Sequence, residues 1–108
     1  MILSIAPTPP APKQPRDVVD FLNSADPYEP AAVTPLRWEK FMKIMHKLGF
    51  EDSQEGPSVV RFNPPQSFKT REYIVFHKPY PDPTLQPAVV TGYARRLKKV
   101  YKDDFTPT

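Results

Sequence analysis

The stretch Ser58–Phe76, SVVRFNPPQSFKTREYIVF, decides the fold that we expect for this chain. It contains two short runs of β-branched and aromatic residues, Ser58–Phe62 and Arg71–Phe76, which is a composition typical of β-strands. Between them, Pro64 and Pro65 lack the main-chain N–H groups that a strand needs, so the chain must turn there. The stretch therefore predicts a β-hairpin.

The residues before the hairpin add a third strand. Phe50–Ser53 is a weak strand, and Gln54–Pro57 is a turn that leads into the next one. Because side chains alternate along a strand, Val60 and Phe62 point to one side of the sheet and Arg61 points to the other. We therefore expect three antiparallel strands.

Amphipathic segments precede and follow the hairpin, which needs such a cover to be stable in water. In the first segment, apolar residues recur at spacings of three and four from Trp38 to Leu48, a pattern typical of one helical face. Thr34 can cap this helix, and Pro35 suits its first position because the N–H there has no partner within a helix. Gly49 is suited to end the helix in the left-handed conformation.

The last helix is expected to begin at Gln86-Pro87 in the same way. Gly92 lies inside it at a cost of about 1 kcal/mol relative to alanine, which close main-chain packing would explain. Its apolar face comprises Val90, Tyr93, Leu97 and either Val100 or Tyr101. The predicted fold class is α+β, in the order α-β-β-β-α, with a three-stranded antiparallel sheet and both helices packed on one face.

Residues 34–105 form this predicted domain, and residues 1–33 form a proline-rich N-terminal leader. Ala6–Pro15 holds five prolines in ten residues, so it is expected to be extended and unable to bury a core. This segment is either a linker or a ligand for an aromatic groove on another protein.

A short helix is expected at residues 16–23, within the leader. Its apolar side chains are too many for a wholly solvated segment, and isolated helices of this length are marginal in water. Two alternatives follow: the helix packs on the domain as an arm, or it folds on a partner. The candidate partner-binding residues are Val18, Val19, Phe21 and Leu22.

Composition excludes several classes of function. The chain has no cysteine, which rules out disulfides, cysteine nucleophiles and cysteine zinc sites. His46 and His77 form no spaced metal cluster, and there is no glycine-rich phosphate loop, so we expect no metal, no cofactor and no small-molecule substrate. No apolar run approaches the roughly 20 residues that span a bilayer, so no membrane contact is expected. The expected location is intracellular, in the cytoplasm or nucleus.

Charge is distributed unevenly along the chain. Residues 1–33 carry two basic and four acidic groups, whereas residues 34–108 carry 13 basic and eight acidic groups. A basic domain of this size is compatible with RNA binding, with cations on the phosphates and an aromatic ring stacked on a base. The candidate RNA-binding residues are Arg61, Lys69, Arg71, Lys78, Tyr80, Arg95, Arg96, Lys98 and Lys99. Alternatively these charges are merely solvated, and those near the end of the last helix complement its dipole.

Three short motifs combine with this order of elements. The motifs are Leu48-Gly49-Phe50, Gly56–Phe62 and Tyr73–Pro79, followed by the closing helix. Together they resemble the HicA toxin-like family, small mRNA-cleaving toxins with a double-stranded-RNA-binding-domain-like fold. The chain is more similar to fungal HicA-like chains of unknown role than to the bacterial toxins. The resemblance covers residues 34–105 and implies the same fold here.

The resemblance does not extend to the catalytic residue of the toxins. The toxin pattern is glycine-serine-histidine, with the histidine as the catalytic group, and the resemblance aligns Ser58 with that serine and Val59 with that histidine. Pro57 stands directly before the serine, where the toxins have glycine. Because valine cannot transfer a proton, the resemblance implies the fold and not the activity. His77, at the end of the next strand, is the remaining catalytic candidate.

Three functions are compatible with these observations. The first is a non-catalytic protein-interaction module, a pseudo-enzyme on a HicA-like scaffold that works within a larger assembly. HicA toxins are bound by an antitoxin protein, and the leader supplies features that RNA binding does not need. The second is an RNA-binding module that uses the basic strands and the last helix. The third is a residual ribonuclease that uses His77 or His46. We expect the first function, with a protein as the partner.

Overall fold

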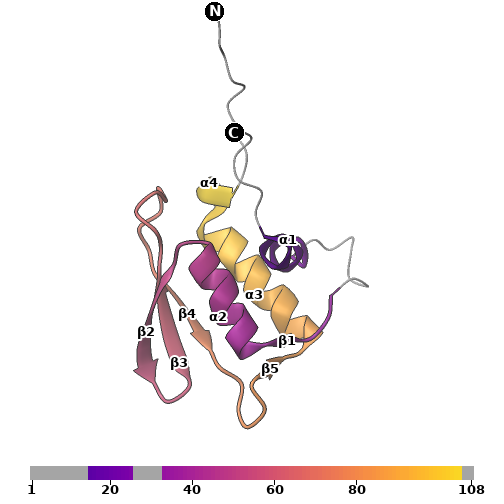
Figure 1. The fold of residues 1–108 in the computed structure, drawn as a ribbon. Coiled ribbons are helices and arrows are strands. Elements are labelled where there is room, and N and C mark those ends of the chain that lie inside the picture. Colours follow the sequence, from indigo (N-terminus) through magenta and orange to yellow (C-terminus); the bar gives the residue numbers. More distant parts are fainter. Residues whose placement is uncertain (1–14, 26–32, 106–108) are drawn as a thin grey trace, which may run out of the picture.

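The computed structural model describes residues 15–25 and 33–105 (Figure 1). The predictions for the proline-rich segment Ala6–Pro15 fall outside these ranges, apart from Pro15 itself. The elements in chain order are α1 (Arg16–Asn23), β1 (Leu36–Arg37), α2 (Trp38–Lys47), β2 (Glu51–Gly56), β3 (Val59–Asn63), β4 (Ile74–His77), β5 (Thr84–Leu85), α3 (Pro87–Val100) and α4 (Lys102–Phe105).

An antiparallel three-stranded sheet in the order β2-β3-β4 forms one layer of the fold. The register pairs Val60 with Phe76 and Phe62 with Ile74, so these buried side chains share one face of the sheet. Helices α2 and α3 lie together on that side of the sheet (Figure 1). The predicted α+β class with a three-stranded antiparallel sheet is confirmed.

The sequence prediction lacks a second, two-stranded sheet, in which β1 pairs antiparallel with β5. Each strand has only two residues, too few to give a periodic signal. Next to this pair, the N–H of Trp38 donates to the carbonyl of Pro83 at 2.8 Å and ties the start of α2 to the segment before α3. The prediction that Thr34 caps the first long helix is wrong, because α2 begins at Trp38 with Arg37 as its N-cap residue.

Two strand boundaries also differ from the prediction. The turn before β3 is only Pro57-Ser58, because residues 54–56 extend β2. The following strand, β4, begins at Ile74 and not at Arg71. The guanidinium of Arg71 donates to the carbonyl of Pro65 at 2.9 Å, so this residue closes the loop before the strand instead of starting the ladder.

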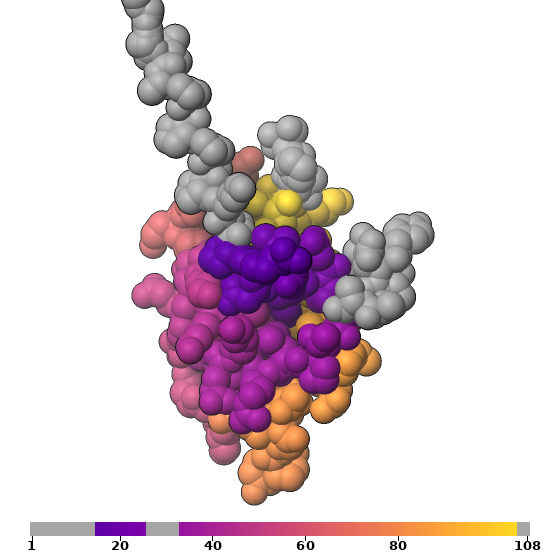
Figure 2. All heavy atoms as spheres, turned by 45° about the vertical axis from the view of Figure 1, so that its right-hand side comes forward, coloured from indigo at the N-terminus to yellow at the C-terminus, as the bar shows by residue number. Residues whose placement is uncertain are grey.

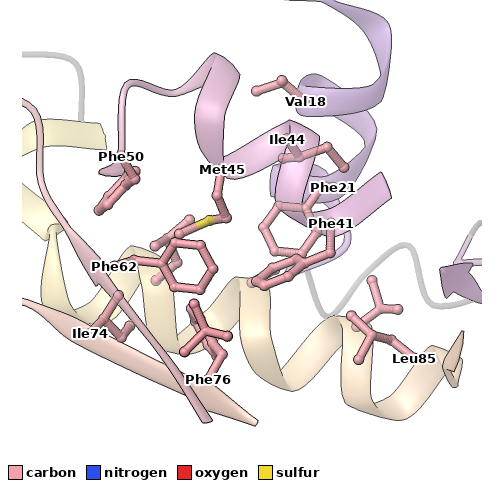
Figure 3. Packing of buried hydrophobic residues seen from close by; sticks show 14 of the residues in the cluster. Val18, Phe21, Phe41, Ile44, Met45, Phe50, Phe62, Ile74, Phe76 and Leu85 are labelled. Carbon is pink, nitrogen blue, oxygen red and sulfur yellow. The ribbon is translucent and has the colours of Figure 1, made fainter. Parts of the chain in front are cut away.

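Phe41 of α2 joins the layers of the core (Figure 3). Its side chain is fully buried, and its ring contacts aromatic rings from four other elements as well as one from its own helix. The partners, with their ring-centroid distances, are Phe21 of α1 (5.5 Å), Trp38 of α2 (5.2 Å), Phe62 of β3 (5.9 Å), Phe76 of β4 (5.2 Å) and Tyr93 of α3 (5.6 Å). The helices and the sheet therefore meet on a single side chain.

A second aromatic cluster holds the loop between β3 and β4 against the last two helices. Phe68 of this loop packs edge-to-face on Phe50, Tyr101 and Phe105, with ring centroids 5.4–5.5 Å apart. Phe50 also contacts Tyr101 at 5.2 Å. Because Phe105 belongs to α4, this short helix closes one end of the core.

Helix α1 packs on the rest of the fold, as the arm alternative predicts. Val18 is 0 % exposed and Phe21 is 3 % exposed, whereas Val19 and Leu22 are only partly buried. Val18 and Phe21, two of the four candidate partner-binding residues, are therefore used inside this chain and do not present a surface to a partner.

Polar contacts add to the attachment of α1. Lys47 of α2 donates to the carboxylate of Asp17 at 2.8 Å, and this hydrogen bond lowers the pKa of Asp17. On the other side, Nε of Arg95 in α3 donates to the carbonyl of Ala25 at 3.2 Å. The short helix is thus held between α2 and α3.

Two glycines have opposite roles. Gly49 follows α2 with a φ of 98°, as predicted, and a Cβ placed on it would lie 2.9 Å from Cβ of Pro65. Both its conformation and this contact therefore exclude a side chain there. Gly92 lies within α3, and apart from its chain neighbours and the backbone of its own helix, no atom of the described residues lies within 4 Å of the position that its Cβ would take. The explanation of Gly92 by close main-chain packing is therefore wrong.

Phe41→Ala removes the ring on which the layers meet. We expect the free energy of unfolding to fall by about 3–5 kcal/mol, because apolar contacts are lost and a cavity is left behind. Lys40→Ala, at the exposed neighbouring position of the same helix, is the matched control and should change it by less than about 0.5 kcal/mol. Urea unfolding measures both variants. An equal loss for the two would contradict the role assigned to Phe41.

Alanine at the two glycines should act in opposite directions. Gly49→Ala is expected to lower the free energy of unfolding by about 1–2 kcal/mol, because a left-handed conformation is imposed on a residue with a Cβ. Gly92→Ala is expected to raise it by about 0.5–1 kcal/mol, because alanine favours the helix and meets no neighbour. Melting temperatures from circular dichroism should shift down and up respectively, and a rise in both variants would disprove the constraint at Gly49.

Candidate functional site

The face of the sheet that points away from α2 and α3 carries a group of side chains that we call the open face. Side chains that alternate with the buried ones form it, and each is either half-buried or exposed. The open face, as we use the term, is the part of this side formed by β3, β4 and the residue before β4, and consists of Val59, Arg61, Asn63, Tyr73, Val75 and His77. Glu51 and Ser53 of β2 lie beside it, because they pair with Asn63 and Arg61. It combines apolar, aromatic and cationic groups on a rigid layer.

Arg61, in the middle of β3, is held on three sides. Its Nε donates to Oδ1 of Asn63 at 3.2 Å, and its guanidinium carbon lies 4.1 Å from the ring centroid of Tyr73. Glu55 of β2 adds an ion pair at 3.9 Å. The cation is therefore ordered in advance beside an aromatic ring, and the residue that carries this ring is 53 % exposed.

Two phenols brace the main chain at the two ends of β4. The hydroxyl of Tyr93 donates to the carbonyl of His77 at 2.6 Å, and the hydroxyl of Tyr101 donates to the carbonyl of Glu72 at 2.5 Å. Burial raises the pKa of Tyr93. Burial, together with the negative charges of Glu72 and Asp104, raises the pKa of Tyr101 to about 12. Both phenols therefore remain donors at neutral pH and fix the strand in place.

The loop Lys78–Pro83 projects Tyr80 into solvent. Its first N–H, that of Lys78, donates to the carbonyl of Ser58 at 2.8 Å, and its last carbonyl, that of Pro83, accepts the hydrogen bond from α2 described above. Figure 2 shows this loop protruding from the end of the molecule opposite α4. Tyr80 is 90 % exposed, so the loop presents an aromatic side chain from a backbone that is fixed at both ends.

The nine candidate RNA-binding residues do not gather on one surface. Arg61 lies on the open face, Lys69 and Arg71 in the loop between β3 and β4, Lys78 and Tyr80 in the loop after β4, and Arg95, Arg96, Lys98 and Lys99 on α3. Even on α3 the charges point apart. Arg95 reaches the carbonyl of Ala25 beside α1, whereas the guanidinium of Arg96 lies 5.0 Å from the ring centroid of Phe76 in β4.

Side chains of Asp104 and Arg71 hold the main chain of the loop between β3 and β4 in place. The carboxylate of Asp104 accepts the N–H groups of Lys69 and Thr70 at 2.7 and 3.2 Å. Burial acts to raise the pKa of Asp104, but these hydrogen bonds lower it overall. Together with the Arg71 contact to Pro65, they show that this loop is organised by its own contacts.

The two histidines lie on different elements, His46 on a helix and His77 on a strand. His46 of α2 pairs with Asp52 of the edge strand β2, whereas His77 lies at the end of β4. The register places His77 directly opposite Val59, the position that the resemblance aligns with the catalytic histidine of the toxins. Within residues 15–25 and 33–105, no group of three or more histidine, cysteine, aspartate or glutamate side chains is arranged to hold a metal ion.

A cavity of about 290 Å³ lies beside α1 and is lined by side chains of α1, α2 and α3 and of the segment before α2. Phe21, Ile44 and Val90 make its wall apolar, and Asp17 and Asp20 add carboxylates. Both carboxylates already pair with cations, Asp17 with Lys47 and Asp20 with Arg16. The cavity therefore offers less for recognition than the open face does.

Sequence reasoning missed Tyr73 as a site residue. Alternation about Ile74 and Phe76 does place Tyr73 on the same side as Val75. Its contact with Arg61, however, depends on the register between β3 and β4. The ten residues that join the two strands hide this register from a reading of the sequence.

The comparisons with known proteins do not extend this picture. No family model matches the chain, and neither a curated protein nor a solved structure matches it. The resemblance to HicA-like proteins therefore stays a prediction. In the part of the chain that the structure describes, no helix has the length and apolar character needed to cross a membrane.

Tyr101→Phe removes one brace of β4. Because folding raises the pKa of Tyr101 from 10.0 to about 12, protonated Tyr101 stabilises the fold fully below pH 10, and this contribution disappears as the pH rises through about 12. We expect the parent chain to lose stability over that window and the variant to lose less. At neutral pH the variant should be less stable by about 1 kcal/mol, because one hydrogen bond is missing. Urea unfolding at stepped pH measures both effects, and identical pH slopes would contradict the assignment.

Proposed function

We propose that this chain is a non-catalytic protein-interaction module and that the open face meets the partner. The observation that carries the proposal is the Arg61–Tyr73 pair, in which an ordered cation lies against an exposed aromatic ring. Arginine and tyrosine are enriched among the residues that dominate the binding energy at protein interfaces. The pair is therefore the expected centre of the binding surface.

The other residues of the open face suit the same role. Val59 and Val75 supply apolar area, while Asn63 and His77 supply hydrogen-bonding groups. Side chains fixed on a sheet lose little conformational freedom when they bind, which lowers the entropic cost of association. Tyr80, on its loop with fixed ends, offers a further aromatic anchor.

The HicA-like resemblance supports a chain that has the fold of the toxins but lacks their catalytic histidine. The position aligned with the toxins' catalytic histidine is Val59, which belongs to the open face and has no proton to transfer. On this proposal the scaffold serves binding alone, as one part of a larger assembly.

RNA binding is the alternative that shares the open face. The 13 basic groups of residues 34–108 support it. One observation favours a protein partner instead. The candidate phosphate-binding cations come from separate elements, and on α3 Arg95 and Arg96 point to different neighbours.

A residual ribonuclease is supported by one contact only, the placement of His77 opposite Val59. Incubation of purified parent chain and His77→Ala with RNA tests it. We expect no cleavage by either protein. Cleavage by the parent that disappears in the variant would establish the enzyme and remove the non-catalytic proposal.

Partner recovery tests the interaction module. Three tagged chains are compared in extracts of the cells that produce the protein: the parent, Arg61→Ala/Tyr73→Ala on the open face, and Lys40→Ala/Lys43→Ala on the exposed side of α2 as the matched control. Parent and control should recover the same protein, and the open-face variant should recover at least about tenfold less, the effect of losing a binding hot spot. Matching melting temperatures confirm that all three chains are folded.

Two results would contradict the proposal. The first is equal recovery of the partner by the open-face variant, since the binding surface would then lie elsewhere. The second is loss of the partner from every chain after the extract is treated with ribonuclease, because RNA would then be the bound molecule.

A further inference from the structure

The two edges of the three-stranded sheet differ in how they are protected from pairing with another strand. Five of the six residues of β2 are exposed, three of them carry carboxylates, and its ladder is irregular between Gln54 and Gly56. Charges and irregularities of this kind protect edge strands from further pairing. In contrast, β4 has the sequence Ile-Val-Phe-His, without a carboxylate, lysine or arginine, and pairs with β3 in regular register.

The main chain of β4 directs hydrogen-bonding groups away from the sheet. The N–H of Lys78 donates to the carbonyl of Ser58, which lies opposite, so the even-numbered residues of β4 bond to β3 and the odd-numbered ones, Val75 and His77, face outward. The outward carbonyl of His77 already accepts a hydrogen bond from the hydroxyl of Tyr93. Among the described residues, no hydrogen bond satisfies the outward N–H and C=O groups of Val75.

Cations flank this side of β4. On the helix side, Arg96 lies 5.0 Å from the ring centroid of Phe76, and on the open face Arg61 stacks on Tyr73. Lys78 follows the strand, while Glu72, before it, and Glu55, which pairs with Arg61, are the opposing charges. A second copy of the chain would bring like charges together here, whereas a strand with carboxylates would be attracted.

We propose that the outer edge of β4, defined by the outward main-chain groups of Val75, accepts an extended acidic segment of another polypeptide as a fourth strand of the sheet. This inference rests on the proposed function and states how the partner binds. Main-chain hydrogen bonds hold the segment in place. Because side chains alternate, its carboxylates reach Arg61 on one face of the sheet and Arg96 on the other.

The direct test uses a synthetic valine-rich peptide, with glutamates on both faces of its extended form, and amide-resolved NMR of the full chain. We expect chemical-shift changes centred on residues 73–77, slower amide exchange at Val75, and binding that weakens as salt is added. The same peptide with N-methylated amides, and one with lysine in place of glutamate, should each bind at least about tenfold more weakly.

Proline substitution separates strand addition from other contacts. Val75→Pro deletes an outward N–H without breaking a bond to β3, and edge strands tolerate proline at such positions. Gln54→Pro makes the same change at an outward position of β2 and is the matched control. We expect the first variant to lose peptide binding and the second to keep it. Arg96→Glu leaves the main chain of the sheet intact and should weaken peptide binding about tenfold. This variant replaces Val75→Pro as the test if the proline variant does not fold.

Three results would overturn the inference. They are peptide binding that survives Val75→Pro in a folded chain, no shift change at residues 73–77 with millimolar peptide, and dimerisation of the chain through β4. The proposed function is tested separately, by recovery of the partner. If the recovered partner is lost from the open-face variant but kept by Val75→Pro, the interaction module stands and strand addition does not.

Discussion

The fold depends on the aromatic contacts of Phe41. Its ring touches one residue in each of α1, β3, β4 and α3, so the helical layer and the sheet share a fixed point. Side chains in a close-packed protein interior have little room to move. Because Phe62 and Phe76 point toward Phe41, the residues that alternate with them along β3 and β4 point to the other side of the sheet. The open face is therefore a direct result of the core.

Most of the fold could be predicted from the sequence, because the patterns that indicate its helices and strands are local and periodic. The three-stranded antiparallel sheet, the helix that begins at Gln86-Pro87 and the left-handed Gly49 all follow from short-range patterns. The β1–β5 pair did not follow, because two-residue strands have no period and depend on contacts between distant segments. For the same reason the start of α2 was misplaced at Thr34, since the Pro83 contact to Trp38 is a tertiary one.

The candidate site was accessible only in part. Alternation along β3 identified Arg61 as an outward residue, and the charge count selected it as a binding residue. Its pairing with Tyr73 required the strand register, which no single segment encodes. The amphipathic pattern of α1 correctly indicated burial, but the pattern is the same whether a helix buries its face in its own chain or in another. Only the contacts of Val18 and Phe21 distinguish these cases.

The attachment of α1 to α3 also bears on how the chain is made. Arg95 meets Ala25 across 70 positions, so α1 leaves the ribosome long before its docking site exists. At about 5–20 residues per second, this interval is on the order of ten seconds. Throughout it, the core that buries Val18 and Phe21 is incomplete, and these apolar side chains stay accessible to chaperones. Folding of the domain described here can therefore be completed only after translation has passed α3.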